Sequence, residues 1–347
     1  MTLSGHAHHA ERVHALLQDR SAAVRSAVAA SWLRSVRDHG LDPEHWRRPE
    51  SLDEARLRHA REQMSPLLRA AEPTLDRLLD AVGDSGCCIL LTGRDGVPLQ
   101  RRGVAGDDDD FRKLGLWTGA VWTEACEGTN GIGTCLIEGR AMTIHRDQHF
   151  YTRNIGLSCT VAPIYDHLGR LAGCLDVSTC RRDADRGVVA LIAAAVGDAA
   201  RRIEAAHFRR AFKGVRILLG PDGGEAGALI AVDRDDLLIG ATRTARRLYG
   251  ITDERLAAGL PAAAVLGDGL EEGLSDAERG VVQRALARAG GNVSGAARIL
   301  GVSRATLHRK IKRLGLRLCQ EQEILENATL MAVSAAPALA HAKLGRS

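Results

Sequence analysis

The feature that most constrains this chain lies near its C-terminus, where residues 290–316 read GGNVSGAARILGVSRATLHRKIKRLGL. The pattern predicts a short helix capped by Asn292 or Ser294, because the side-chain oxygens of these residue types accept hydrogen bonds from the first free backbone N–H groups. Gly301 is placed to end this helix, since glycine tolerates the left-handed backbone that closes many helices. We therefore expect two helices joined by a tight turn.

The second helix of this segment is predicted to follow Ser303, its expected N-cap. Leu307, Ile311 and Leu314 recur at the spacing of one helical face, which we expect to pack inward. Residues 279–320 contain ten lysines and arginines and no acidic residue, whereas the whole chain has a net charge of only +4. Positive charge concentrated in this way is typical of phosphate binding, because a merely solvated helical face normally carries both signs.

These residues resemble the DNA-binding end of the Fis protein and of the bacterial activators that share its helix-turn-helix. The resemblance is carried by GGN, by AAxxLG and by SRATLHRKIKRLG. It implies double-stranded DNA as a partner, with Arg304 reading a base edge, since a guanidinium fits the two acceptors of guanine. The implied DNA-binding residues are Ser294, Ser303, Arg304, Thr306, His308, Arg309, Lys310 and Arg313.

The preceding helix begins with Ser275-Asp276-Ala277-Glu278, a capping box, and carries apolar residues such as Val281 and Val282. In Fis-like proteins this helix pairs two subunits. The resemblance therefore implies a homodimer with recognition helices about 34 Å apart and a near-palindromic operator.

Length and composition predict two to three domains without a membrane partner. The chain has 347 residues, shows no run of eighteen apolar residues and lacks the apolar segment of a signal peptide at its start. We therefore expect a cytoplasmic protein. Its eight cysteines lack the paired spacing of zinc sites, so we expect no metal and no cofactor. A redox-sensor role for Cys126, Cys135 or Cys159 stays open and requires a depressed thiol pKa.

The N-terminal third is predicted to be a helical lead-in behind a flexible tail. Residues 1–20 contain His6, His8 and His9, for which a metal site is the less favoured alternative. Helical patterns follow from Ser21, from Leu52 to Met64 and from Pro73 to Val82. Their first apolar stripe is Val24, Val28, Trp32 and Val36.

The period changes at Gly86, where CCILLTGRDGVPLQRRG predicts a hairpin of two strands. The run from Asp107 to Asp110 is expected to be a solvated loop rather than a calcium site. Residues 122–179 predict a helix, a glycine-rich turn, a strand, a short helix and two further strands joined by a turn at residues 166–169.

This second stretch resembles the GAF sensor domain of the acetoin-catabolism-regulator family. The motifs are WxExxxGTNGIGT, HRDQHF, CTVAPIYD and LAGCLDVST, with an extension back to SWLRSVRDHGLDP at residues 31–43. The resemblance implies an unidentified small-molecule effector bound between the sheet and the helices above it. The implied ligand-binding residues are Trp117, Trp122, Glu124, Asn130, His145, His149, Asn154 and Cys159.

Three other interpretations of this stretch are weaker. GTNGIGT lacks the GK[ST] ending of a P-loop, so a structural turn is favoured. His145 and His149 are four residues apart, but the glutamate of HExxH and a third ligand are missing, which favours a packed or pocket-lining pair. A thiol enzyme would need a base fixed beside Cys126, Cys135 or Cys159, and the sequence shows none.

A long helix is predicted from Asp185 to Phe212, with a surplus that can pair with a partner chain or relay a signal. Residues 227–251 resemble the opening of a PAS domain and are interpreted as a remnant or spacer.

Full-length relatives of the resembled family carry an ATPase domain that engages the sigma-54 polymerase. In this chain residues 267–275 leave no room for such a domain, and no P-loop motif occurs.

The sequence thus predicts an α+β chain and not an enzyme. Its expected parts are an N-terminal tail and helical lead-in at 1–80, a GAF sensor domain (antiparallel sheet with helices) at 81–212, a PAS-like remnant or linker at 213–270, an all-α Fis-type helix-turn-helix at 271–317 and a tail at 318–347. The predicted function is effector-responsive transcription regulation, with RNA polymerase as a further candidate partner. The alternatives are an architectural Fis-like DNA-binding protein and a cysteine-dependent enzyme on the GAF scaffold.

Overall fold

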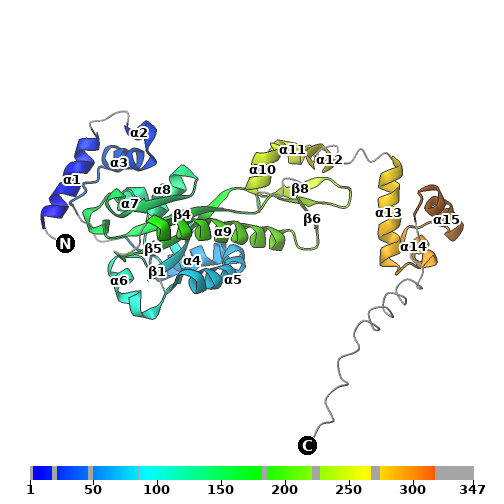
Figure 1. Cartoon of the computed structure of the whole chain (residues 1–347), viewed down its shortest axis with the longest axis horizontal. Helices are drawn as coiled ribbons and strands as arrows, with labels where there is room; N and C mark the ends of the chain where they lie inside the picture. The colour runs from blue at the N-terminus through cyan, green and yellow to red at the C-terminus, as the bar shows by residue number, and fades with distance from the viewer. Residues whose placement is uncertain are drawn as a thin grey trace, which may run out of the picture. The chain divides into compact units, whose positions relative to one another are not determined.

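The computed structural model describes residues 3–17, 22–45, 50–83, 86–181, 186–220, 227–266 and 274–316. The chain divides into two compact units, residues 1–266 and residues 267–347 (Figure 1). The longer elements of the first unit are α1 (Leu3–Leu17), α3 (Ala27–Arg37), α4 (Glu54–Gln63), α5 (Ser65–Val82), β1 (Cys87–Gly93), β2 (Pro98–Arg102), α8 (Gly131–Glu138), β3 (Met142–His145), β4 (Ser158–Tyr165), β5 (Leu171–Thr179) and α9 (Arg186–Ala211).

The shorter elements of the first unit are α2 (Ala22–Arg25), α6 (Asp108–Lys113), α7 (Glu124–Glu127), β6 (Arg216–Leu219), β7 (Leu229–Val232), β8 (Leu238–Ala241), α10 (Arg243–Tyr249), α11 (Asp253–Ala257) and α12 (Ala263–Leu266), with 3₁₀ turns at Ala105–Asp107, Arg146–Gln148 and Thr152–Asn154. The second unit contains α13 (Leu274–Arg288), α14 (Val293–Ile299) and α15 (Arg304–Arg313). None of the described helices is long and apolar enough to cross a membrane.

The first unit is built on a five-stranded antiparallel sheet in the order β2-β1-β5-β4-β3. Successive residues of β1 point to opposite faces of the sheet, as the pleat of a strand requires. Ile89 and Leu91 pack in one apolar cluster, whereas Cys88 and Leu90 pack in another. Both faces of the central strands are therefore covered, which explains why β1 is apolar at nearly every position.

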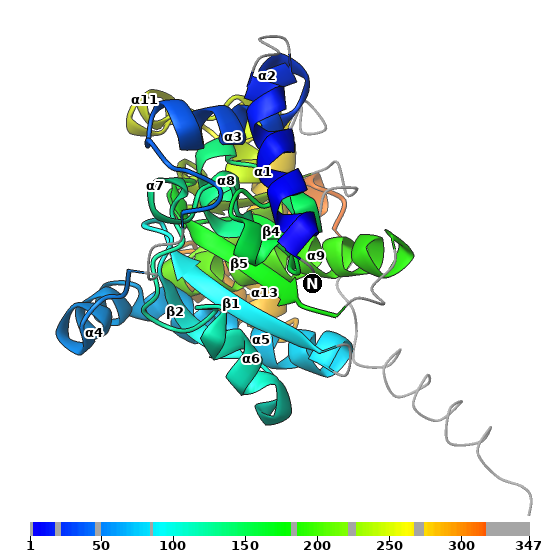
Figure 2. The same ribbon diagram turned by 90° about the vertical axis from the view of Figure 1, so that its left-hand side faces the viewer.

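Helices cover the two faces of this sheet. The first cluster packs α5 and α9 on one face through residues such as Leu75 and Ile203, whereas the second packs α6 and α8 on the other through Phe111 and Ile132. Figure 2 shows α5 and α8 on opposite sides of β1, β4 and β5. This arrangement confirms the predicted α+β class with an antiparallel sheet and helices.

The N-terminal segment differs from the predicted flexible tail. Residues 3–17 form α1, whose Val13 is fully buried against Trp32 and Phe150. His9 lies edge-on to the ring of Trp32, and its Nε2 is 3.2 Å from the carbonyl oxygen of Phe150. The apolar side of α1 therefore packs against Trp32 and Phe150, although the sequence of this segment is mostly polar.

The predicted stripe through Val24 is also wrong at that residue, which is 89% exposed. The physical reason is a break at Ser26, whose extended backbone and side chain cap α3 through the backbone N–H of Ala29. A new helix thus begins after Ser26, and Val24 no longer shares a face with Trp32.

The helix predicted to start at Pro73 begins earlier in the structure, and both Pro66 and Pro73 lie inside α5. Pro66 lies in the first turn, where a missing backbone N–H costs nothing. Pro73 lies in the interior, where it removes a helical hydrogen bond. Burial of Leu67, Leu68 and Leu75 offsets that loss, so the helix begins at Ser65 and not at Pro73.

Two segments that were predicted to be a solvated loop and a structural turn are helical in large part. The run from Asp107 to Asp110 starts α6, because carboxylates are favoured in the first turn of a helix and Asp108 pairs with Arg101 at 2.7 Å. In GTNGIGT the turn is confined to residues 128–130, where Gly128 has a φ of +62°, and Gly131 already begins α8. Apolar contacts of Ile132 and Cys135 with the sheet hold that helix in place.

Residues 216–220 and 227–266 contain a three-stranded antiparallel sheet, β6-β7-β8, followed by α10, α11 and α12. Within residues 227–251, which resemble the opening of a PAS domain, the strands β7 and β8 are followed by α10. This part has an apolar core of its own, made of Ala228, Ile230, Val232, Leu238, Ala241, Ala245, Ile251, Leu260 and Ala262. It is therefore a packed layer and more than a spacer.

The long helix α9 confirms the expected helix of residues 185–212 almost to its ends. Its buried residues Ile192, Val196 and Ile203 follow one helical face against the sheet. Leu191 of the same helix is 74% exposed because it lies about 100° around the helix from Ile192.

Candidate functional site

The helices α13, α14 and α15 pack around one apolar core made of Val282, Ala285, Ala296, Ala297, Leu307, Ile311 and Leu314. Asn292 is the N-cap of α14 and accepts hydrogen bonds from the backbone N–H groups of Ser294 and Gly295 at 3.0 and 3.2 Å. Of the two expected caps the structure thus uses Asn292. The alanines of α14 leave room for close helix packing.

The turn and the second helix also follow the prediction. Gly301 has a φ of +65°, and Ser303 caps α15 by accepting a hydrogen bond from the backbone N–H of Thr306 at 3.1 Å. Leu307 and Ile311 are buried, so the expected inward stripe is confirmed.

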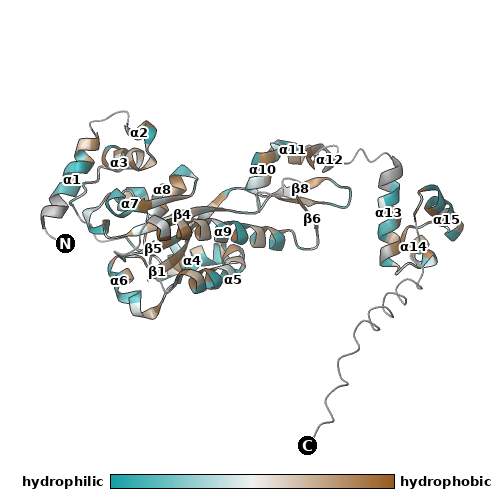
Figure 3. Ribbon diagram, in the orientation of Figure 1, coloured by the Kyte–Doolittle hydropathy of each residue, from teal (hydrophilic) through white to brown (hydrophobic). Residues whose placement is uncertain are grey.

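The outward face of α15 presents most of the predicted DNA-binding residues to solvent. Arg304, His308, Arg309 and Arg313 are exposed, and the ribbon of α15 is largely hydrophilic in Figure 3. In the part of the chain that the structure describes, neither Arg304 nor Arg309 forms an ion pair. Ser294 is exposed at the start of α14. The exposed cations therefore lie on a scaffold fixed by two capped helices.

Two of the predicted DNA contacts have a partner within the protein that the sequence did not suggest. Glu278 of α13 forms ion pairs with Lys310 and Arg313 of α15. The hydrogen bond from Lys310 lowers the pKa of Glu278, and the charge of Arg313 acts in the same direction. Glu278 lies immediately before the acid-free stretch, so the sequence pattern gave no sign that it faces α15.

The predicted capping box of α13 and its pairing face are described only in part. The side chains of Ser275, Asp276 and Ala277 lie outside the described residues, as do Cys319 and the predicted tail. Val282 is buried in the core of this unit, whereas Val281 is 44% exposed. α13 therefore leaves an apolar side chain in solvent beside the face that packs on α14.

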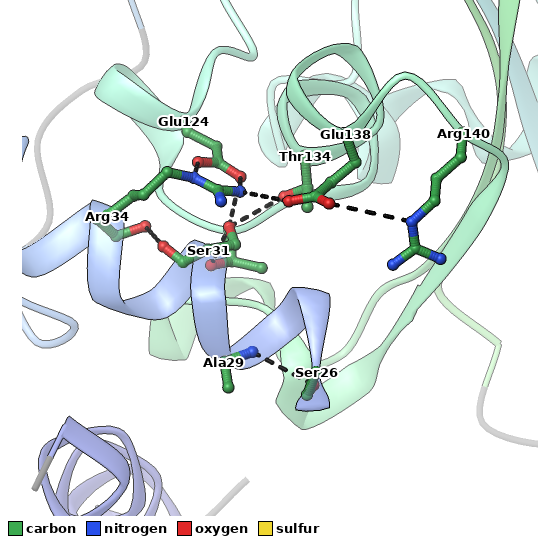
Figure 4. A network of polar contacts seen from close by, with 10 residues as sticks. Ser26, Ala29, Ser31, Arg34, Glu124, Thr134, Glu138 and Arg140 are labelled. Carbon is green, nitrogen blue, oxygen red and sulfur yellow. Dashed lines mark hydrogen bonds and ion pairs between the residues drawn. The ribbon is translucent and has the colours of Figure 1, made fainter. Parts of the chain in front are cut away.

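In the first unit Glu124 is fully enclosed in a polar network (Figure 4). Arg34 donates to its two oxygens, from Nε to Oε2 at 2.8 Å and from Nη2 to Oε1 at 2.9 Å. Ser31 donates to Oε1 at 2.5 Å and lies 2.7 Å from the hydroxyl of Thr129. The predicted effector contact Glu124 is thus already paired with the N-terminal helix α3.

Asn130 and Trp122 are buried with local hydrogen bonds. The Asn130 side chain caps α8 by accepting from the backbone N–H of Gly133 at 2.8 Å, and it donates to the carbonyl of Gly128 at 2.9 Å. Trp122 donates from Nε1 to the carbonyl of Gly115 at 2.9 Å. Both residues fix the loops around α8.

His149 and Cys159 lie side by side inside the protein. Nδ1 of His149 is 2.9 Å from the carbonyl oxygen of Arg146, and Nε2 is 3.3 Å from Sγ of Cys159. Burial lowers the pKa of His149 to about 4 and raises the pKa of Cys159 well above its usual value. The sequence gave no sign that the imidazole of His149 lies beside Cys159. Because burial keeps both side chains uncharged, the pair does not favour a thiolate nucleophile.

Cys159 also accepts a hydrogen bond from the hydroxyl of Ser178 at 3.0 Å, and that hydroxyl lies 2.7 Å from Oδ2 of Asp176. Asp176 is fully buried, and its Oδ1 has no hydrogen-bond partner. Burial raises the pKa of Asp176 to about 7. The sequence gave no sign of this buried carboxyl, because Asp176 lies within the apolar strand β5.

The remaining predicted effector residues occupy separate positions. Trp117 lies between Arg101 and Arg112, each with Cζ 4.2 Å from its ring centre. His145 at the end of β3 is 2.8 Å from the hydroxyl of Ser158. Asn154 is buried beside Glu127. His145 and His149 do not share a helix, because Arg146–Gln148 is a 3₁₀ turn.

Among the described residues, no group of three or more His, Cys, Asp or Glu side chains is arranged to hold a metal ion. A pocket of about 600 Å³ does occur in the first unit. Its walls come from β4, α9, α10 and the loop after α8, and it contains none of the eight predicted effector residues. The position of the effector among those eight residues remains a prediction.

Comparison with known families identifies the first unit. The family model described as MimR, N-terminal domain, matches residues 9–203, which is more than half of the chain. The chain belongs to this family. A second model, described as bacterial regulatory protein, Fis family, matches residues 273–314 and therefore covers α13, α14 and α15. The MimR-type N-terminal domain is thus joined to a Fis-type helix-turn-helix, and the expected resemblance is confirmed.

Known relatives of this MimR-family chain include transcriptional regulators. It is 34% identical over 262 residues to the acetoin catabolism regulatory protein of Cupriavidus necator, covering 74% of this chain and 38% of that protein. It is 31% identical to the acetoin dehydrogenase operon transcriptional activator AcoR of Bacillus subtilis, covering 54% and 31%. It is 34% identical to the propane 2-monooxygenase operon transcriptional activator MimR of Mycolicibacterium smegmatis, covering 47% and 27%. The chain therefore spans less than two fifths of each of these relatives.

Among solved structures, the crystal structure of the E. coli DhaR(N)-DhaL complex contains a similar chain. The similarity has a TM-score of 0.49 at 17% identity and covers 65% of this chain and 77% of that one.

Proposed function

We propose that this MimR-family chain is a transcriptional regulator that binds a near-palindromic operator as a homodimer through its Fis-type helix-turn-helix. The observation that carries the proposal is α15 itself: a capped helix with a buried apolar stripe and an exposed row of cations. A recognition helix needs this combination, because the buried face fixes its angle while the exposed face enters the major groove. Arg304 is the proposed base-reading residue, since it is exposed at the first turn.

The dimer is proposed to form through α13. Val281 is 44% exposed there, although Val282 and Ala285 of the same helix are buried in the core. An apolar residue exposed next to a packed face is suited to a partner helix. Two copies joined in this way would present two α15 helices to successive turns of the major groove, about 34 Å apart.

The first unit is proposed to be a GAF-type sensor domain for a small-molecule effector. Its antiparallel sheet covered by helices supports this assignment, as do the relatives named as regulators of acetoin and propane 2-monooxygenase operons. Effector binding would shift the population of two dimer arrangements. Coupling of this kind typically amounts to about 1 to 3 kcal/mol, which changes operator affinity several-fold to about a hundredfold.

Mapping of chromosomal occupancy in the host cell tests this function. A few sharp sites that share a palindrome are expected. Broad occupancy without a motif would instead favour an architectural DNA-binding protein. A thiol enzyme is disfavoured by the raised pKa of Cys159 and Cys126, and turnover lost on substitution of one cysteine would reinstate it.

A further inference from the structure

The pocket of the first unit lies between β4 of the five-stranded sheet and α10, which follows the three-stranded sheet. It is about 600 Å³ in volume, a size typical of small-molecule sites. One wall is the end of β4, with Pro163 and Tyr165; a second is α9, with Arg201 and Glu204; and α10 closes the third side with Arg243. Because β4 belongs to the five-stranded sheet and α10 to the three-stranded part, a ligand here would touch both.

The lining of this pocket is strongly basic. Four arginines contribute to it, namely Arg140, Arg201, Arg243 and Arg247, whereas Glu204 is the only acidic residue among the residues described as lining it. A guanidinium presents a fork of N–H donors that fits the two oxygens of a carboxylate or phosphate. The composition of the pocket therefore favours an anion.

Two of these arginines have only loose contacts within the protein. Arg201 is 3.7 Å from Asp198 on the same helix, and both side chains are about half exposed. Arg140 is 3.9 Å from Glu138. Ion pairs of this length between exposed side chains contribute little free energy. The guanidinium groups of Arg140 and Arg201 can therefore bind a ligand without breaking a strong ion pair.

Arg243 is placed more firmly. Its guanidinium lies over the ring of Tyr165 at 5.1 Å, which fixes it at the junction of α10 and β4. The turn beside it is tightly packed, since a Cβ at Gly169 would lie 2.7 Å from Cδ of Arg246. A cation that is already held on one wall lowers the ordering cost of binding, because fewer side chains have to be fixed when a ligand arrives.

Glu204 cancels only part of this positive charge at neutral pH. Its Oε1 accepts a hydrogen bond from the backbone N–H of Tyr165 at 2.8 Å. Burial raises the pKa of Glu204 to about 7, while the charge of Arg201 acts in the opposite direction. The other titratable groups near this carboxyl are the Tyr165 phenol, Arg243 and, one turn along α9, His207, which faces His167.

We propose that this pocket binds a small anion carrying a carboxylate or phosphate group, held by Arg201 and Arg243 beside Tyr165. The bound anion would disfavour the ionised form of Glu204. Binding should therefore take up a proton and weaken as the pH rises from about 6 to 8. The proposal concerns binding alone and does not depend on operator recognition.

The test is calorimetric titration of the full chain with malonate and, separately, with inorganic phosphate, at constant ionic strength. We expect saturable millimolar or tighter binding of at least one probe, and the stronger probe identifies the preferred anion. Arg243→Gln and Arg201→Gln should each weaken it about tenfold or more. Arg209→Gln is the matched control, because Arg209 is an exposed arginine of α9 that does not line the pocket. Glu204→Gln retains the acceptor for Tyr165 and should remove the pH dependence of malonate binding, whereas phosphate keeps the pH dependence of its own second ionisation.

Three results would overturn the proposal. The first is no saturable binding of either probe to the wild-type chain. The second is binding that both pocket variants retain in full. The third is binding lost in Arg304→Gln but not in Arg243→Gln, which would place the anion on the DNA-binding face of α15.

Discussion

Arg34 and Glu124 form a bidentate ion pair that joins the N-terminal helix α3 to α7, with N–O distances of 2.8 and 2.9 Å. The Glu124 side chain is fully buried and that of Arg34 is 25% exposed. Removal of one partner from such a pair leaves a buried charge without compensation, which is far more costly than the loss of a surface pair.

Arg34→Ala is therefore expected to lower the free energy of unfolding of the first unit by about 3 to 5 kcal/mol. Arg12→Ala provides the control, because Arg12 pairs with Asp147 where both side chains are about half exposed. That change should cost at most about 1 kcal/mol. Urea unfolding followed by circular dichroism measures both, and equal losses would contradict the buried role of Glu124.

Arg304→Ala should relax base preference at one operator position by about 1 to 3 kcal/mol. Lys310→Ala should weaken binding to all sequences alike, since a phosphate contact carries no sequence information. Fluorescence anisotropy with an operator and with duplexes changed at single positions separates the two effects. Unchanged discrimination by the Arg304 variant would assign base reading to another residue.

Glu278→Gln should strengthen DNA binding without regard to sequence. The substitution removes the negative charge that pairs with Lys310 and Arg313, so both cations become available to phosphates. Each added phosphate contact steepens the slope of log K against log salt by about 0.9. A salt titration of DNA affinity measures this slope. Weaker binding would instead show that Glu278 orients the two cations for DNA.

Cys159 should resist alkylation in the folded protein at pH 7.5, because burial raises its pKa and holds His149 neutral beside it. Cys126 is only partly buried and should react faster, although its pKa is raised as well. Iodoacetamide labelling followed by peptide mass spectrometry compares the two thiols. Rapid native labelling of Cys159 would revive the redox and thiol-enzyme alternatives.

Asp176 should make the protein less stable as the pH rises from about 4 to 7. Its pKa is about 7 in the folded state and near 3.8 when unfolded, so the folded state keeps a proton that the unfolded chain releases. Asp176→Asn should remove this loss, which is of the order of a few kcal/mol at about 1.4 kcal/mol per pKa unit. Unfolding at pH 5 and pH 8 tests it, and equal pH dependence in both proteins would contradict it.

Local chemistry explains which parts of the fold were predictable. Asn292, Gly301 and Ser303 act on backbone groups within three residues, so the helix-turn-helix could be derived from sequence to within a residue. The same holds for the hairpin of β1 and β2, where a glycine turn separates the apolar strand β1 from the more polar strand β2. Val24 misled because the cap at Ser26 starts a new helix after it, and Pro73 misled because packing of the leucines of α5 decides where that helix begins.

The candidate sites depend on contacts across long stretches of sequence. Glu278 meets Lys310 thirty-two residues later, and Tyr165 meets Arg243 only because α10 packs on the end of β4. No motif marks either pair. The resemblance to a sensor domain indicated polar residues around α8 as effector contacts, which stays a prediction, and it could not show that Glu124 is already paired with Arg34.

The central claim is dimeric, sequence-specific DNA binding, and selection of binding sites by the full chain from a pool of random DNA duplexes tests it most directly. We predict convergence on two inverted half-sites whose centres are about one helical turn, or roughly 34 Å, apart. The same selection with the Arg304→Ala variant should lose sequence information within each half-site. A wild-type selection that retains the random composition of the pool, or that yields a single half-site, would contradict the account.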